Sequence, residues 1–235
     1  MSEKQTTVVL VHGAFADASS WSVVVSGLRE RGVPVLAVAN ELRGGASDGA
    51  RVAALVREID GPVLLVGHSY GGVVITEAAS RAENVVGLVY VTAFALKEGE
   101  AVQELLSHYP DSSLGAALVP HELPGQDVVL SLREDAFGAV FAADLPAERT
   151  SVLAVSQRPI AAAAFGEKAG PAAWRTLPSH YLVATADQAI HPQAQRGMAE
   201  RIGATVREVD ASHAVAVSRP DAVLDLIDTA LKVTR

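Results

Sequence analysis

The stretch Val63-Leu64-Leu65-Val66-Gly67-His68-Ser69-Tyr70-Gly71-Gly72-Val73-Val74-Ile75 decides the fold. Its apolar, β-branched beginning predicts a strand buried on both faces. The Ala-rich residues 73–81 predict a helix, with Glu77 on its exposed side. Between them stands Gly-x-Ser-x-Gly, the sharp strand-to-helix turn that presents a nucleophilic serine. We therefore expect Ser69 at a strained backbone position with its hydroxyl above the sheet.

The residues around this serine fit a crowded turn. Gly67 and Gly71 keep side chains away from the place where strand and helix cross. The start of the helix brings backbone N–H groups and a positive dipole end close to Ser69 Oγ. The alternative interpretation is a tight turn in which the serine is incidental.

Composition limits the classes of protein that the chain can represent. Its 235 residues favour one domain, and a hydrophobic fraction of 49% is ample for a large core. The net charge of -8 argues against nucleic acid or an anionic membrane as a partner. The chain has no cysteine, which excludes disulfides, thiolate nucleophiles and thiolate metal sites.

The first seven residues are polar and lack the apolar centre of a signal peptide. No apolar run approaches the length of a membrane span. We therefore expect a cytoplasmic protein without a membrane partner, and the oligomeric state stays open.

Short apolar runs alternate with amphipathic stretches along most of the chain. Besides the run at Val63, strands are expected at residues 7–11, 33–38, 85–91, 180–185 and 205–209. Besides residues 73–81, helices are expected after a cap at Ser19 or Ser20, and at 50–59, 192–202 and 220–231. Residues 40–49 are expected to form a loop. This alternation predicts an α/β fold: a mostly parallel, doubly wound sheet of about six strands with helices on both faces.

The alternation stops between residues 94 and 178, a stretch too long for a loop. It has helical patches at 100–108, 130–142 and 146–154 and no convincing buried strand. We interpret residues 96–177 as a helical cap inserted into a single domain whose core is 1–95 and 178–235. The cap follows a strand end, so it is expected over the edge of the sheet that carries Ser69. A mobile, poorly packed excursion is the alternative.

A serine hydroxyl needs a neighbouring base, and that base needs a carboxylate to hold its tautomer. His213 lies in the loop after the last strand, on the same edge of the sheet as Ser69. Asp187 follows the preceding strand and is the natural orienting acid. Asp210 is an alternative orienting acid, although Asp210 stands only three residues before His213. Glu98 is a weaker alternative.

Charge that develops on a substrate carbonyl oxygen is best met by backbone N–H groups that are already oriented. The N–H of Tyr70, directly after the serine, and the N–H of Ala14, after the first strand, are the candidates. The alternative interpretation of Ala14 is an ordinary turn residue that does not bind the carbonyl oxygen. His12 is expected to brace its loop and His68 to be a satisfied core residue. No metal-binding or dinucleotide-binding motif is present, and this chemistry needs no cofactor.

Together these residues resemble the α/β-hydrolase family over essentially the whole chain. Two motifs resemble its plant methylesterase and hydroxynitrile lyase branch, together with its bacterial relatives: Val11-His12-Gly13-Ala14 followed by Trp21, and Val66 to Gly72. Three later stretches are also similar: Val91-Thr92-Ala93-Phe94, Asp187 to Ile190 with Pro192, and Ser212-His213-Ala214 ahead of Arg219-Pro220. The resemblance implies Ser69, Asp187 and His213 as a catalytic triad, and Ala14 with Tyr70 as oxyanion donors.

The departures from the branch narrow the expected reaction. Its lyases carry Thr where Gly13 stands and Lys where Ala214 stands, so cyanohydrin cleavage is not expected. Haloalkane dehalogenases need a carboxylate where Ser69 stands, which excludes that reaction. The expectation is a serine hydrolase that cleaves small carboxylic esters through an acyl-enzyme. Cofactor-free perhydrolase or haloperoxidase activity, lactone or C–C bond hydrolysis, and a small-molecule receptor remain alternatives.

Overall fold

The computed structural model describes residues 4–122, 124 and 127–234, so residues 1–3 of the polar N-terminus lie outside it. Six parallel strands form the main sheet in the order β2-β1-β3-β4-β8-β9. They are β1 (Thr7–Val11), β2 (Val35–Val38), β3 (Val63–His68), β4 (Val85–Val91), β8 (Ser179–Ala184) and β9 (Thr205–Val209). The predicted parallel α/β sheet of about six strands is confirmed.

The central strands are apolar on both faces because both faces are covered. In β3, Val63 and Leu65 pack into one core cluster, while Leu64 and Val66 pack into the other. All four side chains are completely buried. This two-sided burial is why a continuous apolar run, rather than an alternating one, marks the strand in the sequence.

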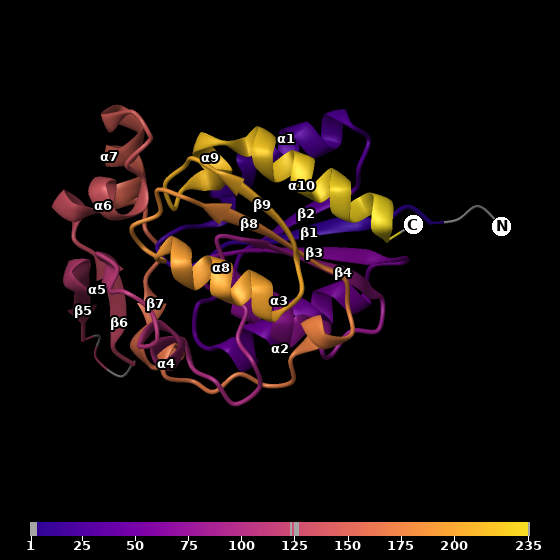
Figure 1. Ribbon diagram of the computed structural model, residues 1–235, viewed down its shortest axis with the longest axis horizontal. Coiled ribbons are helices and arrows are strands. Elements are labelled where there is room, and N and C mark those ends of the chain that lie inside the picture. The colour runs from indigo at the N-terminus through magenta and orange to yellow at the C-terminus, as the bar shows by residue number, and fades with distance from the viewer. Residues whose placement is uncertain (1–3, 123, 125–126, 235) are drawn as a thin grey trace.

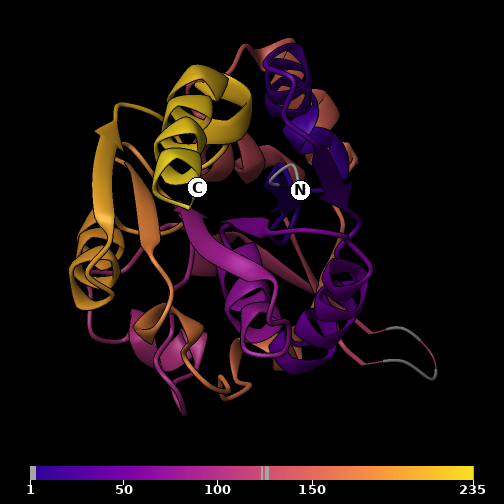
Figure 2. The ribbon, with the colours of Figure 1, turned by 90° about the vertical axis from the view of Figure 1, so that its right-hand side faces the viewer.

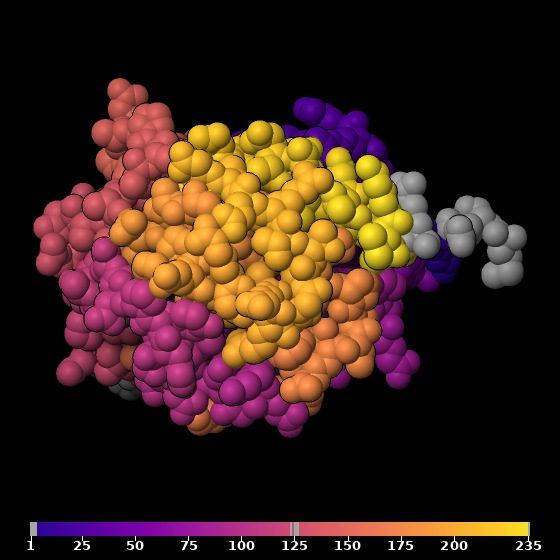
Figure 3. Space-filling view, in the orientation of Figure 1, coloured from indigo at the N-terminus to yellow at the C-terminus, as the bar shows by residue number. Residues whose placement is uncertain are grey.

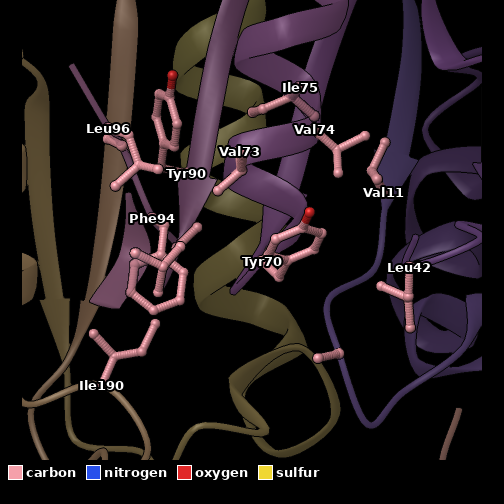
Figure 4. Packing of buried hydrophobic residues seen from close by; sticks show 14 of the residues in the cluster. Val11, Leu42, Tyr70, Val73, Val74, Ile75, Tyr90, Phe94, Leu96 and Ile190 are labelled. Atoms are coloured by element: carbon pink, nitrogen blue, oxygen red, sulfur yellow. The ribbon is translucent and has the colours of Figure 1, made fainter. Parts of the chain in front are cut away.

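The two clusters are closed by helices on opposite sides of the sheet (Figures 1 and 2). One side holds η1 (Ala18–Trp21), α1 (Ser22–Glu30), α9 (Val215–Ser218) and α10 (Pro220–Val233). The other holds α2 (Gly45–Arg57), α3 (Gly71–Ala79) and α8 (Pro192–Arg201). Figure 4 shows the cluster of Val63 and Leu65 around α3, with Phe94 and Tyr70 on opposite sides of Val73. None of the described helices has the length and hydropathy that crossing a membrane requires.

Some predicted boundaries were wrong, and one of them depends on a distant residue. Strand β2 begins at Val35 rather than at residue 33. The helix after β1 is capped by the Asp17 side chain, which accepts from Ser19 N, and not by Ser19 or Ser20. Helix α2 begins at Gly45, inside the predicted loop, and its first N–H groups are met by the Glu167 carboxylate.

The middle of residues 96–177 lies at the carboxyl ends of the strands, at the left of Figures 1 and 3, while the first and last parts run below the sheet along the lower side of the view. The helices are α4 (Val102–Leu106), α5 (Leu114–Ala117), α6 (Glu134–Phe141), α7 (Ala147–Val155), η2 (Ala162–Phe165) and η3 (Ala173–Arg175). The sequence indicated no convincing buried strand here, and the structure adds three short ones: β5 (Leu118–His121), β6 (Val129–Leu132) and β7 (Ile160–Ala161) form an antiparallel sheet. The strand pattern is weak because these strands are short and partly exposed.

The expected exposure of Glu77 was also wrong. Its side chain is buried, pairs with Arg81 at 3.1 Å and accepts from Gly170 N. Gly170 belongs to the returning end of residues 96–177, which therefore cover a helix face that a local pattern places in water. A second link joins Phe15 N to Arg158 O at 3.0 Å.

Gly71 is the tightest point of the turn after β3. A Cβ on Gly71 would lie 2.4 Å from Val11 O, a backbone atom of the neighbouring strand. The same construction on Gly67 places a Cβ 2.5 Å from Gly71 O. Strand, turn and helix therefore pack backbone against backbone, as the Gly-x-Ser-x-Gly spacing predicts.

Replacing Gly71 with alanine is expected to lower the free energy of unfolding by about 1–3 kcal/mol or more, because the backbone has to shift. Chemical denaturation of the purified variant measures this change. Gly115→Ala is the matched control, since a Cβ at that helical position meets nothing within 4 Å. Equal stability of the two variants would contradict the close approach.

Candidate active site

Ser69 follows β3 at the carboxyl edge of the sheet, in the expected sharp turn. Its φ of 54° lies in the left-handed region, which non-glycine residues adopt at a cost. The turn is held because Ser69 N donates to Val91 O at 3.2 Å, and Ser69 O accepts from Phe94 N at 3.0 Å. Ser69 lines a cavity under residues 96–177.

His213 lines the same cavity and pairs with Asp187 behind it. His213 Nδ1 lies 2.7 Å from Asp187 Oδ2, and both residues are almost fully buried. Since an ionised carboxylate can only accept, Nδ1 carries the proton in this pair, which leaves His213 Nε2 as the acceptor. That is the tautomer a general base for a serine hydroxyl requires.

The Asp187 carboxylate is surrounded by donors. Its Oδ1 accepts from Ala189 N at 2.7 Å and Ile190 N at 2.9 Å. Its Oδ2 accepts from Gln195 Nε2 at 2.8 Å and Thr92 Oγ1 at 3.1 Å, in addition to His213. A buried carboxylate with this many donors is fixed in position and compensated for lost water.

Two of these donors were not singled out from the sequence. Thr92 follows β4 with a φ of 39°, unusual for a β-branched residue, and its hydroxyl lies 3.1 Å from His213 Nδ1. Gln195 is a completely buried amide on α8 whose Oε1 also accepts from Ala184 N at 3.0 Å. The one signal that could have indicated Gln195 is its place among Ala194, Met198 and Ala199 on the buried face of a helix that is otherwise polar.

The two alternative acids lie elsewhere. Asp210 and Glu98 are both exposed, and neither contacts His213. The structure therefore joins Asp187, rather than either alternative, to the imidazole.

The two candidate N–H donors lie beside Ser69. Ala14 and Tyr70 line the cavity, and no hydrogen bond among the described residues uses the N–H of either. Gly13 brings the two loops together, since a Cβ on it would be 2.6 Å from Ser69 Cβ and 3.1 Å from Tyr70 N. The loop is braced by His12, whose Nδ1 donates to Gly13 O at 2.9 Å.

His68 packs against His213 with 4.7 Å between ring centroids, but it is not a second base. Burial, reinforced by the neighbouring His213, lowers the pKa of His68 to about 3, so the ring is neutral. Its Nε2 donates to His213 O at 2.9 Å. His68 is therefore a core residue that holds the backbone of His213.

The cavity is apolar apart from the groups already described, and it is narrow, with a volume of about 10 Å³. Its apolar walls are Phe15, Phe94, Leu114, Phe141, Phe165, Ala189 and Ile190. A second hollow, beside the first, shares Phe15 and Phe141 with it and is also lined by Ala214. Within the described ranges, no group of three or more His, Cys, Asp or Glu residues could hold a metal ion.

Comparison with solved structures shows the same architecture in several proteins. Polyneuridine aldehyde esterase superposes with a TM-score of 0.81 at 19% identity, covering 96% of this chain and 99% of that one. A pyrethroid hydrolase from Sphingobium faniae JZ-2 superposes with a TM-score of 0.79 at 23% identity, covering 97% of this chain and 98% of that one. A methylesterase from Arabidopsis superposes with a TM-score of 0.78 at 18% identity, covering 97% of this chain and 99% of that one.

Sequence comparison adds a partial relative and a family. A carbendazim hydrolyzing esterase from Nocardioides sp. (strain SG-4G) is 33% identical over 111 residues. That match covers 42% of this chain and less than half, 46%, of the relative. The model of the alpha/beta hydrolase family matches residues 8–226, which include the serine turn, the acid and the histidine. The chain belongs to the alpha/beta hydrolase family.

Proposed function

We propose that this protein is a serine esterase that cleaves small, apolar carboxylic esters with Ser69, His213 and Asp187. The observation that supports it most is the buried His213–Asp187 pair at 2.7 Å, with His213 and Ser69 facing one cavity. The relatives named as esterases and hydrolases agree with this reaction class.

In the proposed reaction, Ser69 Oγ attacks the ester carbonyl while His213 Nε2 takes the hydroxyl proton. The N–H groups of Ala14 and Tyr70 stabilise the negative charge on the carbonyl oxygen. His213 returns the proton to the leaving alcohol, and an acyl-enzyme remains on Ser69. Water then gives a proton to His213 while its oxygen bonds to the acyl carbon. The bond from that carbon to Ser69 Oγ breaks, His213 passes the proton to Oγ, and the carboxylic acid leaves.

The cavity supports small apolar groups as the substrate class. Its volume is about 10 Å³, close to the room that one water molecule needs, so only small groups can enter without movement of the walls. Its walls carry no charged side chain other than the ionisable His213, so they offer no partner for a charged acyl group. Residues 96–177 act in this proposal as a cap that keeps water from the cavity during acyl transfer.

A burst experiment with a fluorophosphonate control tests this proposal. A fluorophosphonate probe should label Ser69 rapidly, and short-chain p-nitrophenyl esters should show a burst followed by steady turnover. A panel of esters, lactones, and acetate with peroxide compares the reaction classes. Binding of esters without labelling or turnover would indicate a receptor, and faster lactone opening or peracid formation would replace ester cleavage as the main activity.

A further inference from the structure

The residues on both sides of His213 are tied to the end of α6, which belongs to residues 96–177. Before His213, Ser212 N donates to Asp144 Oδ2 at 3.0 Å, and the Ser212 hydroxyl donates to the other oxygen of that carboxylate. After it, Ala214 N donates to Phe141 O at 2.8 Å. None of these bonds is to the parallel sheet.

On its core side, His213 has one backbone link. His68 Nε2 donates to His213 O at 2.9 Å. The imidazole itself is held by Asp187 and lies 4.7 Å from the Phe141 ring in an edge-on arrangement. The His213 backbone is therefore clamped between the core and α6, and Asp144 is the only charged group in that clamp.

We propose that Asp144 is a positioning residue for catalysis: its carboxylate holds Ser212, and through it places His213 against Ser69. This inference rests on the proposed function. It makes residues 96–177 part of the frame that assembles the catalytic groups, and not only a cover. Asp144 contacts neither the cavity nor the imidazole, so its effect on His213 passes through Ser212, the neighbouring residue that it holds. The Ser218 hydroxyl also contributes to lowering the pKa of Asp144, but Ser218 does not adjoin His213 in the chain.

The electrostatics of this contact favour a charged, persistent link. Partial burial acts to raise the pKa of Asp144, but the hydroxyl and N–H of Ser212 outweigh it, and the pKa lies below its usual value. Hydrogen bonds to an ionised acceptor are about twice as strong as neutral ones. Losing the carboxylate also leaves a mostly buried N–H of Ser212 without its partner.

The test compares Asp144→Ala with Asp135→Ala by steady-state kinetics on a p-nitrophenyl ester. Asp135 also belongs to the α6 region, but it is 75% exposed and pairs only locally with Arg133. We expect Asp144→Ala to lower kcat about 10- to 100-fold, because small misplacements of a catalytic group have effects of this size. KM should stay within about twofold. Asp135→Ala should match the wild type in both constants.

The conservative variant Asp144→Asn separates positioning from general loss of structure. Its amide oxygen still accepts from Ser212 N, and its NH₂ group can donate to the Ser212 hydroxyl. We expect it to recover at least half of the lost kcat on a logarithmic scale, more than its recovered thermal stability accounts for. Recovery of kcat only in proportion to recovered thermal stability would overturn the positioning role.

A double variant shows whether the effect passes through His213. Asp144→Ala should leave the residual rate of His213→Ala unchanged, because residues that act as one unit are not additive. The same fold-loss in both backgrounds would overturn the inference. If wild type and Ser69→Ala differ strongly while Asp144→Ala equals Asp135→Ala, the inference fails and the esterase proposal stands. If wild type neither labels nor turns over, the esterase proposal itself fails.

A readout without substrate completes the test. The His213 Nδ1 proton, shared with Asp187, should give a resolved downfield NMR signal in the wild type. Asp144→Ala should broaden or lose it through faster exchange with water, while Asp135→Ala keeps it. An unchanged signal in Asp144→Ala would show that Ser212 does not need the carboxylate to hold His213.

Discussion

Replacing Ser69 with alanine is expected to lower kcat on short p-nitrophenyl esters on the order of 10³-fold or more. The proposed reaction passes through a covalent bond to Ser69 Oγ, and Ser69 is the one serine or threonine among the described residues that line the cavity. Backbone N–H donors and binding would leave a small residual rate. Steady-state kinetics and the absence of a burst measure the loss.

Ser151→Ala is the matched control for this variant. Ser151 is exposed on α7, and its hydroxyl bonds only to Glu148 O of the same helix, at 2.9 Å. It should retain full activity and full fluorophosphonate labelling at Ser69. Turnover by Ser69→Ala close to that of the wild type would end the proposed mechanism.

Replacing Asp187 with asparagine is expected to lower kcat by about 10²- to 10⁴-fold. The present carboxylate accepts from five donors, including His213 Nδ1 at 2.7 Å. An amide brings its own N–H₂ into this ring of donors and favours the other imidazole tautomer. Kinetics on the same ester panel, with circular dichroism as a check of folding, measure the effect.

Asp210→Asn is the control for Asp187, because Asp210 is the nearby acid that also follows a strand. It is exposed and does not touch His213, so this variant should behave like the wild type. A larger loss in Asp210→Asn than in Asp187→Asn would reverse the assignment of the orienting acid.

Residues that act through local chemistry could be predicted from the sequence. The run from Val63 to Ile75 specifies strand, turn and helix because each local preference agrees with the others. The positions of Asp187 and His213 at one edge follow from parallel strands, which bring all their carboxyl ends together. The comparisons confirm the family and the fold that these residues predict.

Features that depend on distant residues could not be predicted. Glu77 is covered in part by Gly170, 93 positions later, whose N–H donates to its carboxylate. The first N–H groups of helix α2 are met by Glu167, more than 120 positions later. The contact between Asp144 and Ser212 spans 68 residues and leaves no periodic trace in the chain.

The attachments of residues 96–177 also determine how this molecule loses its structure. Bonds from Arg158, Glu167 and Gly170 reach back to the first third of the chain, and Asp144 reaches forward to the last. Residues 96–177 therefore cannot unfold separately without breaking hydrogen bonds that the rest of the chain needs. Heat should therefore disrupt both in one cooperative transition, with no half-unfolded species in which the sheet outlasts its covering.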